Sequence, residues 1–404
     1  MPRQPVTEVL ACLAPGRIGG LALRNRLVRA ATSETMATPT GEATDALTHC
    51  YAALARGGAG LIITGHIYVE PHGQYEPFQT GLDTDARIAG LSRATTAVHR
   101  EGGAIFAELS HAGSQSQIAS IQPIAPSVVP NAMSARPPIE MDEADIADVV
   151  SCFAAAARRA RETGFDGIHI HSGNGYLLAQ FNSPFANRRQ DRWGGDAARR
   201  GNFLLAVYRA VRAAVGADFP VTVRLGMADT VAPGLVLEES LALAAQLAHE
   251  GLDGIEVSLG IMRSYLENIR PYVGVTRGRA LADGLVHRLG AALVAEAYYR
   301  PFAKAVKAKV DIPVILVGGL RSTQVMDDVI ASGDADFLAL ARPFVREPDL
   351  VDKIRRGRRG TVACVSCNLC LKHEGMDALK CWRTPAGIAE HVYKYYLREL
   401  FRPK

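Results

Sequence analysis

The sequence has no marked excess of charge of either sign. Its 404 residues include 45 Lys and Arg and 41 Asp and Glu, which give a formal net charge of +4. A charge this dilute does not form the basic surface that nucleic-acid binding needs. The segment Met1–Ala14 has no apolar run followed by a small-residue cleavage site, so neither a signal peptide nor a membrane span is expected. We therefore expect a cytoplasmic protein that binds neither nucleic acid nor a membrane.

Cysteine is scarce, with seven residues in the chain, and this excludes a disulfide-rich scaffold. Three cysteines lie far apart in the sequence: Cys12, Cys50 and Cys152. The other four lie in one segment, with spacings of two, two and ten residues: Cys364, Cys367, Cys370 and Cys381. Four thiolates at this spacing can surround a [4Fe-4S] cluster or a structural zinc ion, and uncoordinated thiols are a third interpretation.

A Gly-x-Gly-x-x-Gly turn is missing after the first strand-like segment, which disfavours a doubly wound dinucleotide-binding fold. Instead, eight β-rich segments alternate with amphipathic helical stretches, the pattern of βα units around a parallel sheet. The expected strands are Arg26–Ala31, Gly60–Thr64, Ala104–Leu109, Gly167–Ile170, Val221–Leu225, Gly254–Ser258, Val314–Val317 and Phe337–Leu340. The expected helices include Val149–Thr163, Arg199–Val215 and Leu237–Glu250. This pattern predicts the α/β class: a closed (β/α)₈ TIM barrel over residues 1–345, followed by a short cysteine-containing C-terminal extension over residues 346–404.

Polar side chains cluster where the fourth expected strand ends, and in such a barrel the chemistry lies at the carboxyl ends of the strands. His169 and His171 face the same way along that strand, and Asn174 and Tyr176 follow on a glycine-containing turn. A histidine and a carboxamide can donate two hydrogen bonds to one oxygen, while a phenol can supply a proton. This set suits a substrate whose carbonyl oxygen gains negative charge while a neighbouring carbon is protonated. The alternative is that these side chains only close the barrel.

The motif His171-Ser172-Gly173-Asn174-Gly175-Tyr176, together with the segment Asn187–Gly195, resembles the old yellow enzyme family of FMN-dependent ene-reductases. The resemblance implies an oxidoreductase that passes hydride from NAD(P)H through FMN to the C=C bond of an α,β-unsaturated carbonyl or enoyl substrate. It assigns His171 and Asn174 to the substrate carbonyl and Tyr176 to proton donation. His169 matches no catalytic position of the family, so the resemblance implies that it packs in the core or supports the site from behind.

The resemblance also implies which residues contact FMN. Arg224 would lie at the N1 and O2 edge of the flavin, where a cation stabilises negative charge on the ring. Four residues after the seventh and eighth strands match the family's phosphate cradle: Gly318, Gly319, Ala341 and Arg342. The remaining expected contacts come from the first three strands: Ala31, Thr32, Ser33, Gly65 and Glu108.

Three positions depart from the family pattern. Ala31 stands where the family often has proline, and His66 is bulkier than the small residues usual beside the flavin. Glu108 replaces the flavin-binding glutamine of the third strand. A carboxylate there donates no hydrogen bond unless it is protonated, so either the pKa of Glu108 is raised or Glu108 pairs with Arg224.

The segment Ala363–Cys370 resembles the iron-sulfur segment of 2,4-dienoyl-CoA reductase and trimethylamine dehydrogenase, which belong to the same wider flavin family. This favours a [4Fe-4S] cluster over zinc. In those enzymes the cluster passes electrons to a second flavin in further carboxyl-terminal domains, whereas only Trp382–Lys404 follow the last cysteine here. We therefore expect the reductant to come from solution or from an electron-transfer partner protein.

Two further functions stay open at this point. One is an amine-dehydrogenase-like flavoprotein that passes electrons through an iron-sulfur cluster to a partner protein. The other is a flavin- or cluster-binding interaction protein. The long segment Ile261–Ala291 predicts a lid or wall over the site. Glu390–Leu400 predicts a docking helix, or an interface such as that of a homo-oligomer.

Overall fold

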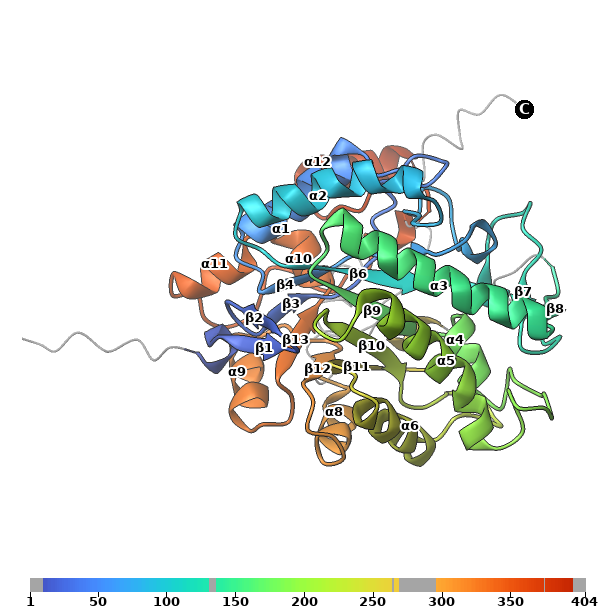
Figure 1. Cartoon of the computed structure of the whole chain (residues 1–404). Coiled ribbons are helices and arrows are strands. Elements are labelled where there is room, and N and C mark those ends of the chain that lie inside the picture. The colour runs from blue at the N-terminus through green and yellow to red at the C-terminus, as the bar shows by residue number, and fades with distance from the viewer. Residues whose placement is uncertain (1–9, 131–135, 264, 269–295, 374, 395–404) are drawn as a thin grey trace, which may run out of the picture.

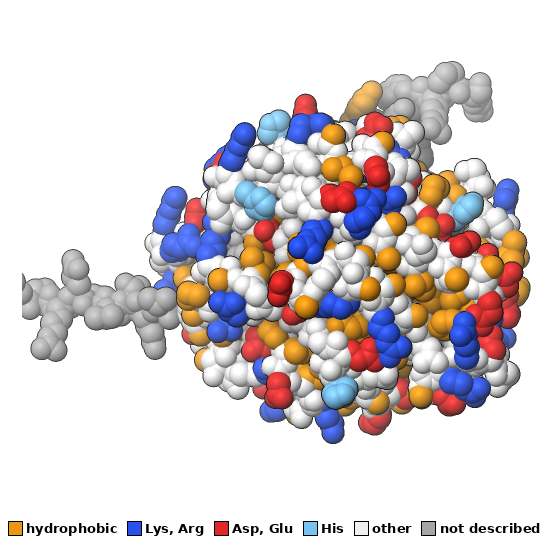
Figure 2. Space-filling view, in the orientation of Figure 1, with side chains coloured by type: hydrophobic (Ala, Val, Ile, Leu, Met, Phe, Trp, Pro, Cys, Tyr) orange, Lys and Arg blue, Asp and Glu red, His pale blue; other side chains and the backbone are white. Residues whose placement is uncertain are grey.

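The computed structural model describes residues 10–130, 136–263, 265–268, 296–373 and 375–394. Most of the expected lid segment, residues 269–291, and residues 395–400 of the expected terminal helix lie outside the described residues. No helix within the described ranges is long and apolar enough to cross a membrane. On the face shown in Figure 2, Lys and Arg side chains are interspersed with Asp and Glu, in keeping with the balanced composition.

Eight parallel strands close into a barrel, as the sequence predicts (Figure 1). The barrel strands are β3 (Leu27–Arg29), β4 (Leu61–Ile63), β6 (Ile105–Ser110), β9 (Gly167–Ser172), β10 (Val221–Gly226), β11 (Gly254–Ser258), β12 (Val314–Val317) and β13 (Phe337–Leu340). They follow one another in chain order, and β13 pairs with β3 to close the ring, with Leu338 opposite Leu27. Each expected strand overlaps one of these, because strands covered on both faces read as apolar runs.

Helices surround the barrel on the outside (Figure 1). They are α1 (Asp45–Arg56), α2 (Ile88–Arg100), α3 (Glu143–Thr163), α4 (Leu177–Asn182), α5 (Ala197–Val215), α6 (Leu237–His249), α8 (Arg300–Lys307), α9 (Thr323–Ala331), α10 (Arg342–Arg346) and α11 (Leu350–Arg355). The sequence placed the start of α3 six residues too late, because a capping box between Asp142 and Asp145 starts the helix on its polar first turn. Gly164 ends α3 at φ 89°, a conformation that favours glycine.

An antiparallel hairpin of β1 (Gly16–Ile18) and β2 (Leu21–Leu23) covers the amino-terminal end of the barrel. Ile18 and Leu23 are buried in the same apolar cluster as Phe106 and Phe337, whose side chains come from barrel strands. The hairpin turn at Gly19 packs against Asp253, which directly precedes β11. With this end filled by apolar side chains, the carboxyl ends of the strands are left for a site. Besides the hairpin, three further short strands of the described ranges lie outside the barrel: β5 (Ile67–Tyr68), which pairs in parallel with the end of β6, and the pair β7 (Ile124–Ala125) and β8 (Ile139–Glu140).

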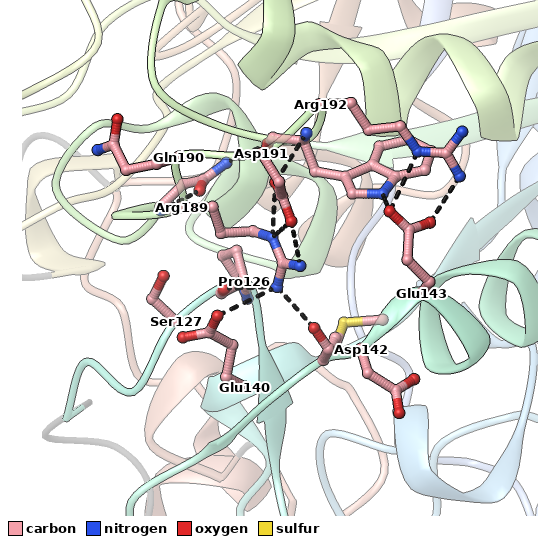
Figure 3. Close-up of polar contacts among 12 residues, drawn as sticks. Pro126, Ser127, Glu140, Asp142, Glu143, Arg189, Gln190, Asp191 and Arg192 are labelled. Carbon is pink, nitrogen blue, oxygen red and sulfur yellow. Dashed lines mark hydrogen bonds and ion pairs between the residues drawn. The ribbon is translucent and has the colours of Figure 1, made fainter.

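Arg189 joins the segment after α4 to the region around β7 and β8 (Figure 3). Its Nη1 donates to the backbone oxygen of Met141 at 2.6 Å and to that of Pro126 at 3.3 Å. Its Nε and Nη2 donate to the carboxylate of Asp191 at 3.0 Å and 2.5 Å. Next to it, the indole nitrogen of Trp193 donates to the Glu143 carboxylate at 2.8 Å at the start of α3. Hydrogen bonds of the polar Asn187–Gly195 segment therefore connect the chain after α4 to the region of β7 and β8 and to the start of α3.

The C-terminal extension folds back onto the barrel. The backbone N–H of Leu379 donates to the backbone oxygen of Glu34 at 2.8 Å, and the Thr35 hydroxyl donates to the backbone oxygen of Asp377. Its helix, α12 (Pro385–Val392), begins five residues before the start that the sequence suggested. The Thr384 hydroxyl caps α12, and Pro385 is tolerated in its first turn. The predicted division at residues 345 and 346 falls at the end of α10 and stays a prediction.

Candidate active site

A cavity of about 370 Å³ opens at the carboxyl ends of the barrel strands. Every residue predicted to be catalytic or to bind FMN lines it, except Gly65. These residues are Ala31, Thr32, Ser33, Glu108, His171, Asn174, Tyr176, Arg224, Gly318, Gly319, Ala341 and Arg342. The closed barrel brings together residues that lie more than 300 positions apart in the chain. This convergence follows from parallel strands whose carboxyl ends share one rim.

His171, Asn174 and Tyr176 lie close together on β9 and the turn that follows it. The ring of Tyr176 meets the ring of His171 edge-on, with centroids 4.5 Å apart. Asn174 takes a left-handed backbone conformation with φ 53°. Its Oδ1 accepts hydrogen bonds from the Ser258 hydroxyl at 2.8 Å and from Nδ2 of Asn268 at 3.0 Å. Because its oxygen is occupied in this way, Asn174 offers its Nδ2 donor to a ligand.

His171 keeps one ring nitrogen available. Its Nδ1 lies 3.5 Å from Oε2 of Glu108, and its buried Nε2 faces no such group; neither nitrogen has a hydrogen-bond partner among the described residues. A buried polar atom without a partner costs free energy unless a ligand or water satisfies it. Together with Nδ2 of Asn174, this nitrogen gives the cavity two polar groups from one strand end that can hold a ligand oxygen.

Arg224 lies between two buried carboxylates. Its Nε is 2.7 Å from Oε1 of Glu256 and 3.6 Å from Oε2 of Glu108. Burial acts to raise the pKa of Glu108, but Arg224 and His171 outweigh burial and hold this pKa below its usual range. The sequence left two interpretations open, a raised pKa of Glu108 or a pair with Arg224. The geometry favours the pair, in which Glu108 is an ionised carboxylate.

The opposite end of the cavity is built from the turns after β12 and β13. Gly318 and Gly319 have φ values of 117° and 74°, and a Cβ on either would meet the Tyr298 ring at 2.7 Å. Only glycine fits both the backbone and the space at these positions. Arg342 begins α10, lines the cavity and donates from Nη1 to Oδ1 of Asn368 at 2.5 Å. A close backbone turn next to a guanidinium is a suitable place for a phosphate.

Three of the predicted FMN-contacting residues, which follow the first two barrel strands, make hydrogen bonds within the protein. Gly65 lies behind the wall, where its N–H donates to the Glu34 carboxylate at 2.9 Å and a Cβ would collide with that carboxylate. The Ser33 hydroxyl lines the cavity but donates to Oε1 of Glu76. Thr32 donates its hydroxyl to the backbone oxygen of Ala30 at 2.9 Å. These three residues hold the wall in place by bonds within the protein.

His66 lines the cavity with its tautomer fixed by Gln79. Oε1 of Gln79 accepts from the backbone N–H of Tyr75 at 2.7 Å, so Nε2 of Gln79 is the donor to Nδ1 of His66 at 3.0 Å. The proton of the neutral ring is therefore on Nε2. Burial lowers the pKa of His66 to about 4, so the ring is neutral near pH 7. Its ring centroid lies 5.4 Å from that of Tyr176, which places a further donor beside the predicted proton donor.

The four clustered cysteines line a second, smaller cavity of about 70 Å³. Arg342 and Cys370 line both cavities, so the two adjoin. Burial raises the pKa of Cys370 to about 12, so its thiol is protonated as it stands. Across the described part of the chain, no group of three or more His, Cys, Asp or Glu side chains is arranged to hold a metal ion. The thiols are gathered, but they do not form a coordination site, so a [4Fe-4S] cluster is not supported by this arrangement.

Several residues of the site were not found from the sequence. Glu256 was read as part of an apolar strand, and Asn268 was read only as part of a long loop. Tyr75 and Gln115 come from loops that carry no motif but line the cavity. A signal for Glu256 did exist, since a carboxylate inside a buried strand needs a partner and Arg224 stands opposite it on the neighbouring strand.

The geometry describes a (β/α)₈ barrel with a polar cavity at its carboxyl end. Residues 12–360 match the NADH:flavin oxidoreductase / NADH oxidase family, and the chain belongs to this family. It is 35% identical over 386 residues to an NADH oxidase of Thermoanaerobacter brockii, which covers 94% of this chain and 56% of that protein. It is 34% identical to the 4,4'-dithiodibutanoate disulfide reductase of Rhodococcus erythropolis, covering 88% of this chain and 91% of that protein.

A solved structure of 2-naphthoyl-CoA reductase superimposes with a TM-score of 0.82 at 24% identity, covering 94% of this chain and 58% of that one. At this identity the likeness concerns the fold alone. The chain thus spans little more than half the length of the Thermoanaerobacter protein and of the naphthoyl-CoA reductase chain.

Proposed function

We propose that this chain is an FMN-dependent ene-reductase that uses NAD(P)H to reduce the C=C bond of an α,β-unsaturated carbonyl or enoyl compound. The observation that carries the proposal is the convergence of His171, Asn174 and Tyr176 on the same cavity as Arg224 and the Gly318-Gly319 turn. One end offers an imidazole, an amide and a phenol, and the other offers a backbone turn with a guanidinium. Such a cavity suits a cofactor with a ring and a phosphate, with a carbonyl substrate beside the ring.

The residues present fit FMN. The Gly318-Gly319 turn and Arg342 would hold its phosphate, and Arg224 would stabilise negative charge on its reduced ring. When bound, FMN supplies the hydride transfer that no amino-acid side chain provides. Glu108 stays ionised beside Arg224 and therefore orients the guanidinium, but it donates no hydrogen bond to the ring.

The substrate side is built by the β9 turn. Nδ2 of Asn174 would donate a hydrogen bond to the substrate carbonyl oxygen, and a His171 ring with protons on both nitrogens would donate a second one from Nε2 while its Nδ1 faces Glu108. Both bonds would stabilise negative charge that develops on the carbonyl oxygen. The phenol of Tyr176 would give its proton to the carbon next to the carbonyl. The Tyr176 side chain is only 7% exposed, which keeps bulk water away from this proton transfer.

Purified protein reconstituted with FMN provides the test. We expect flavin absorbance that stays with the protein through gel filtration, and oxidation of NADH or NADPH that depends on an added enone such as 2-cyclohexenone. An NADH oxidase and a disulfide reductase are among the relatives of this chain, which supports oxidoreductase chemistry, and the enone assay identifies the acceptor. Flavin binding without enone turnover would overturn the ene-reductase assignment, and a failure to bind FMN would overturn the proposal as a whole.

An iron-sulfur cluster and an electron-transfer partner protein stay predictions from the cysteine spacing. The four thiols share one cavity next to the proposed FMN site, but as they lie among the described residues they are not arranged to hold a metal ion. Iron and acid-labile sulfide should be measured on protein purified without oxygen, beside a Cys364→Ser variant. About four irons and four sulfides per chain in the wild type, lost in the variant, would support the cluster. Zinc, or no metal, would exclude it.

A further inference from the structure

Glu256 is fully buried in the middle of β11 and does not line the cavity. It lies behind Arg224, with the Arg224 Nε 2.7 Å from its Oε1. The proposed chemistry gives Glu256 no role. A carboxylate in this position is costly to keep ionised, because a buried charge needs a partner of its own.

The groups around Glu256 are mostly hydrogen-bond acceptors. Its Oε2 lies 3.9 Å from Nε2 of His169, and that nitrogen is 3.7 Å from Oε2 of Glu108. The Thr222 hydroxyl donates its only proton to the backbone oxygen of Ile168 at 3.1 Å. Nδ1 of His169, 2.7 Å from the Thr222 hydroxyl oxygen, must therefore be the donor in that bond.

The His169 tautomer follows from this bond. With its proton on Nδ1, a neutral His169 presents a lone pair on Nε2 to the two carboxylates. Burial lowers the pKa of His169 to about 3, so the ring is neutral near pH 7. Two carboxylate oxygens and a ring nitrogen then face one another, all of them acceptors.

If both Glu108 and Glu256 were ionised, their two negative charges would face the single positive charge of Arg224. On the strands packed against β11, Arg224 on β10 is the cation that faces Glu256, and β12 places the apolar Ile315 beside it. Among the described residues, Glu108 on β6 competes for the same guanidinium and also faces Nδ1 of His171 at 3.5 Å. Two carboxylates that share one cation do not both ionise easily. Glu108 is the one that ionises more easily, because it faces both Arg224 and Nδ1 of His171.

We propose that Glu256 is a positioning residue for Arg224 that carries a proton in the resting protein and exchanges it when the charge in the cavity changes. This proton removes one negative charge from the cluster of acceptors. It also leaves Arg224 with Glu108 as its one ionised partner. Burial, reinforced by Glu108, raises the pKa of Glu256 to about 7 despite the opposing effect of Arg224, in line with this assignment.

If the cavity holds FMN, as the proposed function has it, the proton on Glu256 affects how tightly FMN binds. With Glu256 protonated, the charges of Arg224 and Glu108 cancel at the cavity wall. When Glu256 ionises, one net negative charge appears there and weakens the binding of an electron-rich ring edge beside Arg224. The affinity for FMN should therefore fall as the pH rises through neutrality.

The first experiment needs no ligand. An infrared pH titration of the purified full chain should show the carbonyl absorption of a protonated carboxyl that disappears near neutral pH and is missing from Glu256→Gln. In Glu108→Gln it should disappear at a lower pH, because Arg224 then serves Glu256 alone. Glu239→Gln is the matched control, since Glu239 pairs with the buried Arg200 away from the cavity. Identical titrations in wild type and Glu256→Gln, with no shift in Glu108→Gln, would overturn the proposal.

The second experiment measures the dissociation constant of FMN by flavin fluorescence between pH 6 and pH 8.5. We expect a rise of at least about threefold in the wild type and in Glu239→Gln, and a flatter profile in Glu256→Gln. Equal profiles in all three proteins would show that Glu256 does not act on the cavity through Arg224. If FMN binds to none of them while the infrared titration behaves as expected, the proposed function fails and the protonation of Glu256 stands.

Discussion

Two buried arginines sit in surroundings of opposite character. The Arg189 guanidinium donates to the Met141 and Pro126 backbone oxygens and to the Asp191 carboxylate (Figure 3). Arg224 faces two carboxylates, in a cluster where several buried polar atoms have no hydrogen-bond partner among the described residues. A buried arginine whose donors all have acceptors, such as Arg189, stabilises the fold. Buried polar atoms without hydrogen-bond partners beside a cavity, as around Arg224, are available to a ligand. The difference predicts that substitutions around Arg224 change chemistry and that substitutions around Arg189 change stability.

The largest expected effect is on catalysis, at Tyr176. Tyr176→Phe removes the proposed proton donor, so reduction of the alkene should slow by about 100-fold or more, while reduction of the flavin by NAD(P)H should change little. Stopped-flow absorbance separates the two half-reactions. Tyr208→Phe is the control, since the Tyr208 hydroxyl donates to the Glu250 backbone oxygen outside the cavity. Equal losses in both half-reactions would remove the acid role from Tyr176.

The next effect is on stability, at Arg189. Arg189→Ala leaves the Met141 and Pro126 oxygens without this donor, so the free energy of unfolding should fall by about 2 kcal/mol. Urea unfolding measures this change, and the affinity for FMN should stay within twofold of the wild type. Arg192→Ala, at a side chain that is 68% exposed, should cost less than about 1 kcal/mol. A loss of FMN binding in Arg189→Ala at unchanged stability would contradict the contrast between the two arginines.

A smaller effect concerns pH. Folding raises the pKa of Glu256 from 4.5 to about 7, so the folded state binds this proton more tightly than the unfolded chain does. The wild type should therefore lose stability as the pH rises between these values. Glu256→Gln removes this contribution, so its unfolding free energy should fall less over the same range, by on the order of 1 kcal/mol. Urea unfolding at pH 5.5 and pH 8 checks it, and parallel profiles would count against a protonated Glu256.

The smallest effect is expected at His66. Its Nε2–H is a donor beside Tyr176, so His66→Phe should raise the KM for an enone several-fold, with little change in kcat, at a cost of about 1 kcal/mol. Because the pKa of His66 is about 4, the pH profile above pH 6 should be the same in both proteins. His66→Gln keeps a donor and should recover part of the loss. A pH profile that changes in His66→Phe would show that the ring titrates in the working range.

The sequence predicted the barrel well because its strands are buried on both faces and stand out as apolar runs between amphipathic helices. The start of α3 was missed because the Asp142–Asp145 capping box begins it on polar residues, outside the apolar pattern. Placement of His171, Asn174, Tyr176 and Arg224 on one cavity agrees with the expected positions, although their roles stay proposals. Glu256 was missed, since its importance depends on neighbours from other strands.

By itself, the sequence determined the order and type of the elements, the family resemblance and the residues at the strand ends, because these depend on local patterns along the chain. Only the tertiary structure decided which groups face one another. It paired Glu108 with Arg224, fixed the tautomers of His66 and His169 through Gln79 and Thr222, and placed Glu256 behind Arg224. Charge and proton positions are set by burial and by distances of a few ångströms between different strands, and no pattern along one strand specifies those distances.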